Sequence, residues 1–113
     1  MHELSIAEGI LDIVRDTIQT EPGAVVEKVF VDVGALVAVV PDSLDFCYTA
    51  ITAGTPLEGS ELVIRQVPIS VRCRDCGGSS EVKSFIFRCP HCDGGALETL
   101  SGNELSVTEI EVQ

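Results

Sequence analysis

Apolar side chains return every three or four positions along the first 20 residues of the chain. Charged and amide side chains occupy the opposite side, and this pattern predicts an amphipathic helix. The apolar positions are Ile6, Ala7, Ile10, Ile13, Val14 and Ile18. Ser5 and Glu8 match a Ser-x-x-Glu capping box, so we expect the helix to begin at Ser5 and to leave residues 1–4 outside it.

Residues 25–33 change to the two-residue alternation of a strand, in which every second valine lies on one face. These valines are Val29, Val31 and Val33. A second helix is expected to start at residues 41–43, which have the composition of a helix N-terminus, and to stop at Gly54. Cys47 falls on the apolar side of this helix, and we interpret it as a core residue.

Three further segments have the composition of strands. The first runs from residue 62 to residue 71, and Pro68 within it indicates a sheet edge or a strand end. A short second strand is predicted at residues 84–88. The third covers residues 105–112, and its alternation changes phase near Thr108, as it does at a β-bulge.

Four of the five cysteines form two pairs, Cys73-Arg-Asp-Cys76 and Cys89-Pro-His-Cys92, with twelve residues between the pairs. Two intervening residues let both sulfurs of a tight turn point at one centre, and two such turns complete a tetrahedron. Zinc suits four thiolates best. Iron in a rubredoxin-like site is the competing metal. Disulfides or a redox dithiol pair are less favoured, because the first 20 residues are acidic and lack the basic start of a secretory signal.

The last strand has too little apolar surface to stand alone, and most simply it rejoins the N-terminal sheet. We therefore predict an α/β fold in which two helices pack on a small mixed sheet and a zinc-ribbon domain is inserted. Residues 1–69 and 102–113 would form the α/β domain, and residues 70–101 the zinc-binding domain. The length of 113 residues suits this plan.

Composition limits the partners of this chain. Its formal net charge is −11 with seven basic residues in total, so a phosphate backbone would be repelled and nucleic acid is not expected as a partner. No apolar run approaches the ~20 residues of a membrane span. We expect a soluble, cytoplasmic protein that does not bind membranes. The sequence leaves its oligomeric state open.

Met1-His2-Glu3 is a second candidate metal site. A free amine, the His2 amide and the His2 imidazole can reach one small cation, and deprotonated amide nitrogens are ligands that nickel(II) and copper(II) favour. The expected helix start at Ser5 would hold these residues close to ordered structure.

These motifs follow one another along the chain in the order of a known family, and the chain resembles the HypA/HybF nickel metallochaperones of hydrogenase maturation. The resemblance rests on the opening Met1-His2-Glu3-Leu4-Ser5, on Val31-Asp32-Val33-Gly34, on Pro41-Asp42-Ser43-Leu44 and on the two cysteine pairs. It covers essentially the whole chain. An opening Met-His-Glu together with two cysteine pairs at this separation is far more specific than either motif alone.

The resemblance implies that His2 and the main-chain nitrogens of His2 and Glu3 bind nickel as cargo, with Met1 and the Glu3 carboxylate as further candidates, and that zinc is structural. Asp42 is an additional candidate oxygen ligand if its loop folds back over Met1. The resemblance also implies a HypB-like GTPase as partner and delivery to the large subunit of a nickel-iron hydrogenase.

The predicted function is therefore that of a nickel metallochaperone and not of an enzyme, because four cysteines close the coordination shell that a catalytic zinc leaves open. Two alternatives remain: a rubredoxin-like iron electron carrier, and a zinc ribbon that serves protein interaction.

Overall fold

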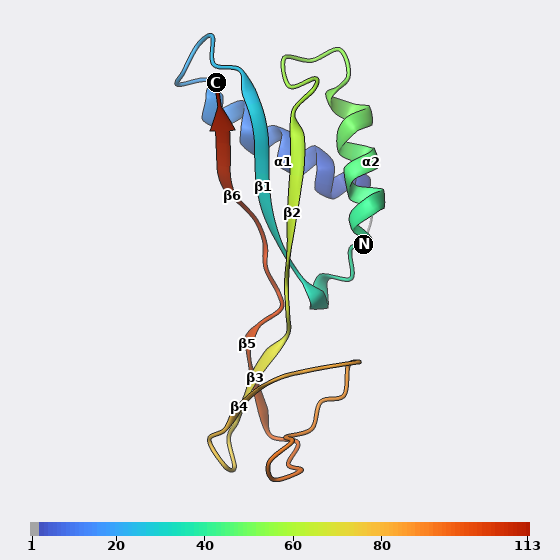
Figure 1. Ribbon diagram of the computed structural model, residues 1–113, viewed down its shortest axis with the longest axis vertical. Helices are drawn as coiled ribbons and strands as arrows, with labels where there is room; N and C mark the ends of the chain where they lie inside the picture. The colour runs from blue at the N-terminus through green and yellow to red at the C-terminus, as the bar shows by residue number, and fades with distance from the viewer. Residues whose placement is uncertain (1–2) are drawn as a thin grey trace.

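The computed structural model describes residues 3–113, which form an elongated molecule of 55 × 25 × 17 Å. Two three-stranded sheets follow one another along its length, and two helices pack against the first sheet (Figure 1). No helix in residues 3–113 is long and apolar enough to cross a membrane.

The central strand of the first sheet is β1 (Val26–Gly34). It pairs in parallel with β2 (Glu61–Val67) and antiparallel with β6 (Leu105–Val112). The expected alternation is confirmed, because Val29, Val31 and Val33 are all buried. The return of the last strand to the N-terminal sheet is confirmed as well.

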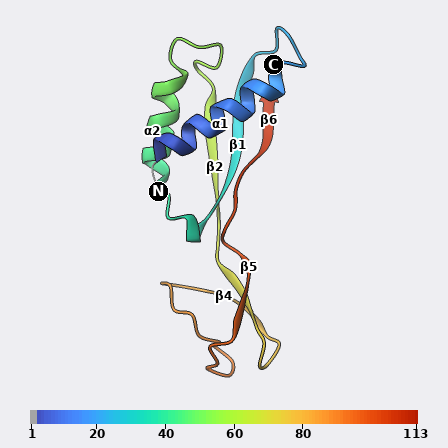
Figure 2. The same cartoon turned by 180° about the vertical axis from the view of Figure 1, so that it is seen from behind.

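One face of this sheet carries the hydrophobic core. Helix α1 (Glu3–Ile18) crosses that face, as Figure 2 shows, and α2 (Pro41–Thr52) packs beside α1. Aliphatic side chains make up nearly all of the core, as the low aromatic content requires. Its buried members are Ile6, Ala7, Ile10, Leu11, Val14, Val26, Val29, Val31, Val33, Leu44, Tyr48, Leu57 and Leu62.

The predicted start of the first helix was wrong. Helix α1 already includes Glu3 and Leu4, so Ser5 lies inside the helix and does not cap it. An acidic side chain in the first turn is favourable to the helix dipole, and Glu3 supplies one. Glu3 is also held from outside the helix, because the Ser43 hydroxyl donates a hydrogen bond to its carboxylate at 3.3 Å.

The second helix begins with Pro41 at its first position, where the missing N–H of proline is tolerated. Val40 precedes it without a side-chain cap. A short 3₁₀ turn, η1 (Ala35–Val37), occupies part of the link from β1. Cys47 is half-buried and packs against the edge of the core, in agreement with its interpretation as a core residue.

The second sheet has the order β4-β3-β5 and is antiparallel throughout. Its strands are β3 (Ser70–Cys73), β4 (Ser79–Glu81) and β5 (Leu97–Ser101). Pro68 separates β2 from β3, as predicted. The strand predicted at residues 84–88 is wrong, because Ser84 and Phe85 both adopt left-handed backbone conformations that turn the chain.

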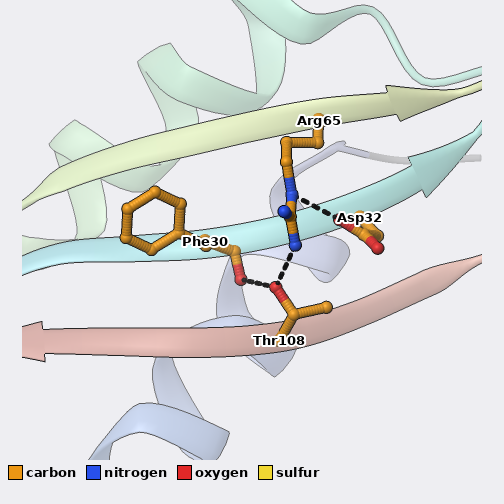
Figure 3. Close-up of polar contacts among 4 residues, drawn as sticks. All are labelled: Phe30, Asp32, Arg65 and Thr108. Carbon is orange, nitrogen blue, oxygen red and sulfur yellow. Dashed lines mark hydrogen bonds and ion pairs between the residues drawn. The ribbon is translucent and has the colours of Figure 1, made fainter.

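The predicted bulge in the last strand is confirmed. Phe30 pairs with Glu109 and Val31 with Val107, so Thr108 is the extra residue. Figure 3 shows that its hydroxyl accepts a hydrogen bond from Arg65 at 2.8 Å, and that Arg65 also pairs with Asp32 at 2.9 Å. Each exposed contact is worth little alone, but together they tie β2, β1 and β6 in one register.

The two sheets meet where Gly34 and Gly102 bring their backbones together. The Gly34 N–H donates to the Glu104 carbonyl at 2.7 Å, and the Leu36 N–H donates to the Gly102 carbonyl at 2.9 Å. A Cβ on Gly34 would collide with the Gly102 carbonyl, although the φ of Gly34 is −74° and suits any residue. Glycine is therefore required there for space and not for conformation.

We predict that Gly34→Ala destabilises the fold by about 2–3 kcal/mol, because the added methyl group meets backbone that cannot rotate away. Gly9→Ala is the matched control: its Cβ meets nothing within 4 Å, and replacing a helical glycine should stabilise by about 1 kcal/mol. Urea unfolding followed by Tyr48 fluorescence measures both, since this single tyrosine is buried in the core. Equal stability of the two variants would contradict the steric argument.

Candidate metal centre

Each cysteine pair sits in a turn with the same backbone hydrogen bonds. In the first turn the Cys73 N–H donates to the Gly78 carbonyl at 2.8 Å, and the Gly77 N–H donates back to the Cys73 carbonyl at 2.8 Å. In the second turn the Cys89 N–H donates to the Gly94 carbonyl at 2.9 Å, and the Asp93 N–H donates to the Cys89 carbonyl at 2.8 Å. The two turns are thus structural repeats of one another.

The repeat is present in the sequence as Cys-x-x-Cys-x-Gly, and the glycines that follow each pair let the backbone reverse beside the sulfurs. The residue after each second cysteine has a left-handed backbone, with φ of 75° at Gly77 and 59° at Asp93. Gly94 lies close to the cluster, since a Cβ there would come 2.9 Å from an Asp75 carboxylate oxygen and 3.2 Å from the Cys92 sulfur.

The two turns bring four sulfurs to one point. Cys73 and Cys92 are 3.6 Å apart between sulfurs, Cys76 and Cys89 are 3.5 Å apart, and all four sulfurs lie within 4.8 Å of one another. A tetrahedral zinc with bonds of about 2.3 Å separates its sulfurs by about 3.8 Å. A disulfide bond is only about 2.05 Å long, and the cysteines are free. The arrangement therefore fits a structural metal such as zinc.

The sulfurs differ in their ionisation. Backbone amides of Cys92 and then of His91 lower the pKa of Cys89 to about 6. The Gly94 amide lowers the pKa of Cys92, but the sulfur of Cys73, burial and the remaining sulfurs outweigh it and raise that pKa to about 12. Cys89 is thus ionised at neutral pH before any metal arrives, and Cys92 is not. A bound dication would favour the ionised form of all four sulfurs.

The predicted N-terminal site falls mostly outside the described residues, because Met1 and His2 precede residue 3. Glu3 begins α1, and its carboxylate accepts the hydrogen bond from Ser43 in the first turn of α2. Asp42 is the neighbour of Ser43 in that turn. The N-termini of the two helices therefore meet at Glu3. The sequence does not predict the hydrogen bond from Ser43 to Glu3, because no local pattern links positions 40 residues apart.

Fold and site together define a small α/β protein with a four-cysteine module of the zinc-ribbon kind. The family model for HypA, described as "Hydrogenase/urease nickel incorporation, metallochaperone, hypA", matches residues 1–112. The chain belongs to this family.

Relatives and solved structures agree with this assignment. The hydrogenase maturation factor HypA of Geotalea uraniireducens is 39% identical over the full length of both chains. That of Desulfosudis oleivorans is 42% identical, with 100% of this chain and 99% of the relative covered. The solution structure of the Ni metallochaperone HypA from Helicobacter pylori shares the fold, with a TM-score of 0.68 at 18% identity over 99% of this chain and 97% of that one.

The ionisation of the cysteines predicts how metal affinity depends on pH. Metal binding must displace the remaining thiol protons, so apparent zinc affinity should rise with pH across the neutral range. Below pH about 6 Cys89 also becomes protonated, and the dependence should steepen by one proton. Competition against a chromophoric chelator measures this slope. Cys47→Ser is the control, because Cys47 lies outside the cluster and its loss should leave the slope unchanged. A zinc affinity independent of pH would contradict the four-thiolate assignment.

Proposed function

We propose that this protein carries nickel(II) bound at its N-terminus, through the His2 imidazole and the main-chain nitrogens of His2 and Glu3, with the Met1 amine close by. The family match carries this proposal, because it begins at residue 1 and so includes the Met-His-Glu opening. The Glu3 main chain lies in the first turn of a helix, where N–H groups have no partner within the helix. The Ser43 hydrogen bond to the Glu3 side chain supports a fixed position for that turn.

The Glu3 carboxylate and Asp42 are the candidate oxygen ligands. Both lie where the two helix N-termini meet, so a cation bound by His2 would find carboxylates nearby. Because the Glu3 main-chain nitrogen can ligate whatever the side chain is, the carboxylate tunes the site and does not define it.

We propose that zinc occupies Cys73, Cys76, Cys89 and Cys92, and that residues 70–101 act as a zinc-binding domain inserted into the nickel-binding domain of residues 1–69 and 102–113. The close approach of the four sulfurs supports zinc, and the separate second sheet supports the boundary. The rubredoxin-like alternative predicts a red, redox-active protein, whereas a zinc protein is colourless.

We further propose that the protein works as a carrier in the cytoplasm, where thiols stay reduced. A HypB-like GTPase and the large subunit of a nickel-iron hydrogenase are its proposed partners. The relatives' designation as hydrogenase maturation factors supports a role in hydrogenase maturation. The family description also names urease, so nickel supply to that enzyme is the second candidate function.

A free N-terminus is the critical requirement of the nickel site. We predict that a tag placed before Met1, or His2→Ala, abolishes tight nickel binding and leaves zinc content unchanged, whereas a tag after Gln113 is tolerated. Because the α-amine has a reference pKa of about 7.7–8.0 and must be deprotonated to bind metal, nickel affinity should also rise with pH near neutrality. Isothermal titration of the zinc-loaded protein measures all of these. Equal affinity in the two tagged proteins would rule out the N-terminal site.

Glu3→Gln should weaken nickel binding less than His2→Ala does. Ser43→Ala is the matched control, because it removes the hydrogen bond to Glu3 and keeps the carboxylate. If Glu3→Gln proved the more damaging change and Ser43→Ala were silent, the carboxylate would be a primary ligand.

Loss of a thiolate should unfold only residues 70–101, the second sheet with its two cysteine turns, which we call the metal module. Structural zinc in small modules contributes about 10–16 kcal/mol of apparent binding energy. We predict that Cys92→Ser lowers zinc content below one per chain while the burial of Tyr48 persists, since Tyr48 belongs to the other sheet's core. Metal analysis and Tyr48 fluorescence test this, and a full zinc in Cys92→Ser would contradict the ligand assignment.

A further inference from the structure

The four clustered cysteines differ in how far solvent reaches them. Cys73 and Cys89, the first of each pair, are buried with only 1% and 3% of their surface exposed. Cys76 and Cys92, the second of each pair, are exposed. Both turns lie at the end of the molecule away from α1 and α2 (Figures 1 and 2). A small reagent in solution therefore reaches the second cysteine of each pair more easily than the first.

Each exposed cysteine has a buried cysteine of the other turn beside it. The sulfurs of Cys76 and Cys89 are 3.5 Å apart, and those of Cys73 and Cys92 are 3.6 Å apart. A thiolate that has been oxidised to a sulfenic acid condenses to a disulfide where a second thiol lies within reach. The cluster contains two such pairs, and both would link the two turns to each other.

The surroundings of Cys76 include an imidazole. The third residue of the second turn is His91, and its ring packs against Gly78 in the first turn. A Cβ on Gly78 would come 3.0 Å from the Cδ2 atom of His91 and 3.5 Å from the Cys76 sulfur, so the ring and the sulfur border the same glycine. An imidazole carries no negative charge, and it does not oppose a reaction at this sulfur that generates hydroxide.

The surroundings of Cys92 include a carboxylate instead. A Cβ on Gly94 would come 2.9 Å from an Asp75 carboxylate oxygen and 3.2 Å from the Cys92 sulfur. A peroxide that accepts electrons from this sulfur develops negative charge on its leaving oxygen, and the nearby carboxylate opposes that charge. Cys92 should therefore react more slowly than Cys76.

We propose that Cys76 is a modification site for hydrogen peroxide, with Cys89 as the cysteine that resolves it. The proposal rests on the assignment of zinc to the four cysteines, because a bound dication favours thiolate at all four positions. Accessibility and neighbouring charge then select the sulfur that reacts first.

The reaction balances in two displacements. The Cys76 sulfur attacks one oxygen of the peroxide, so that an S–O bond forms, the O–O bond breaks and hydroxide leaves. The Cys89 sulfur then attacks the Cys76 sulfur, which forms the disulfide, breaks the S–O bond and expels a second hydroxide. The two thiolates lose two electrons, the peroxide gains them, and both hydroxides take up protons from the solvent to become water.

Oxidation at this site should release the metal. A disulfide leaves only two thiolates in the cluster, and metal affinity depends on the number of thiolate ligands. Within residues 74–96 only Cys89 is buried, so the metal module should lose its fold together with the metal. Thiol–disulfide exchange with cellular thiols reverses the oxidation. The metal module is thus a reversible peroxide-sensitive element.

Peptide mapping of the zinc-loaded full chain tests the proposal. The protein is treated with a small excess of hydrogen peroxide, the remaining thiols are alkylated, and the product is digested with trypsin. Cleavage after Arg74 places the two cysteines of the first turn in separate peptides. The first disulfide is expected to join residues 75–83 to residues 89–113, and fragmentation of the linked peptides is expected to place it at Cys89.

A chromophoric chelator measures zinc in the same reaction, and zinc release should follow formation of the first disulfide. A Cys73–Cys92 bond that forms first, a first bond within one turn, or sulfinic acid without any disulfide would overturn the proposal. The zinc content of the untreated protein is measured separately. Untreated protein without zinc would refute the ligand assignment itself, and this result is distinguishable from a wrong order of oxidation.

Two matched variants test the effect of neighbouring charge, and both should hold a full zinc before treatment. Asp75→Asn removes the carboxylate beside Cys92 and should speed oxidation of that sulfur by about threefold to tenfold, so that a Cys73–Cys92 disulfide also appears early. Asp93→Asn is the control, because this carboxylate is exposed and paired with Arg88 at 3.5 Å, and asparagine suits its left-handed backbone. An unchanged product pattern in Asp75→Asn, or an equal change in Asp93→Asn, would overturn the assigned order.

Discussion

Four sulfurs within 4.8 Å of one another are the constraint on which one half of this molecule depends. Between Arg74 and Ala96 the chain has hardly any buried side chain apart from Cys89, and the hydrogen bonds of the two turns are all close to the cysteines. A whole domain is commonly stable by only about 5–15 kcal/mol, and a structural zinc contributes energy of that size. A metal ion held by the four cysteines would therefore take the place of the hydrophobic core that this segment lacks.

The other half depends on β1, which is the only strand paired on both sides in the first sheet. Helix α1 covers one of its faces with aliphatic side chains, and the Arg65 network fixes the register on the opposite face. The Gly34–Gly102 approach joins this half to the metal module without any side chain between the backbones. The two halves are thus held by different forces and share one narrow junction.

Local patterns in the sequence predicted those parts of the structure that are fixed locally. The alternating valines predicted β1, and the phase change within residues 105–112 predicted the bulge at Thr108. The cysteine spacing predicted the sulfur cluster. Errors arose where tertiary contacts compete with a local motif. The Ser5 capping pattern was overridden by a helix that begins at least as early as Glu3, which Ser43 holds from 40 residues away, and the apolar run at residues 84–88 became a turn instead of a strand.

The strand order also sets a sequence of events during synthesis. Strand β1 pairs with β6, which lies about 75 residues later in the chain. The first sheet can therefore be completed only after the metal module has emerged from the ribosome. Linking residues 73–92 through one ion shortens the effective loop between β2 and β6 and lowers the entropy lost when they come together beside β1. Metal binding by the newly made chain would therefore speed the pairing of β6 with β1 and shorten the time for which the edge of the unfinished sheet is exposed to aggregation.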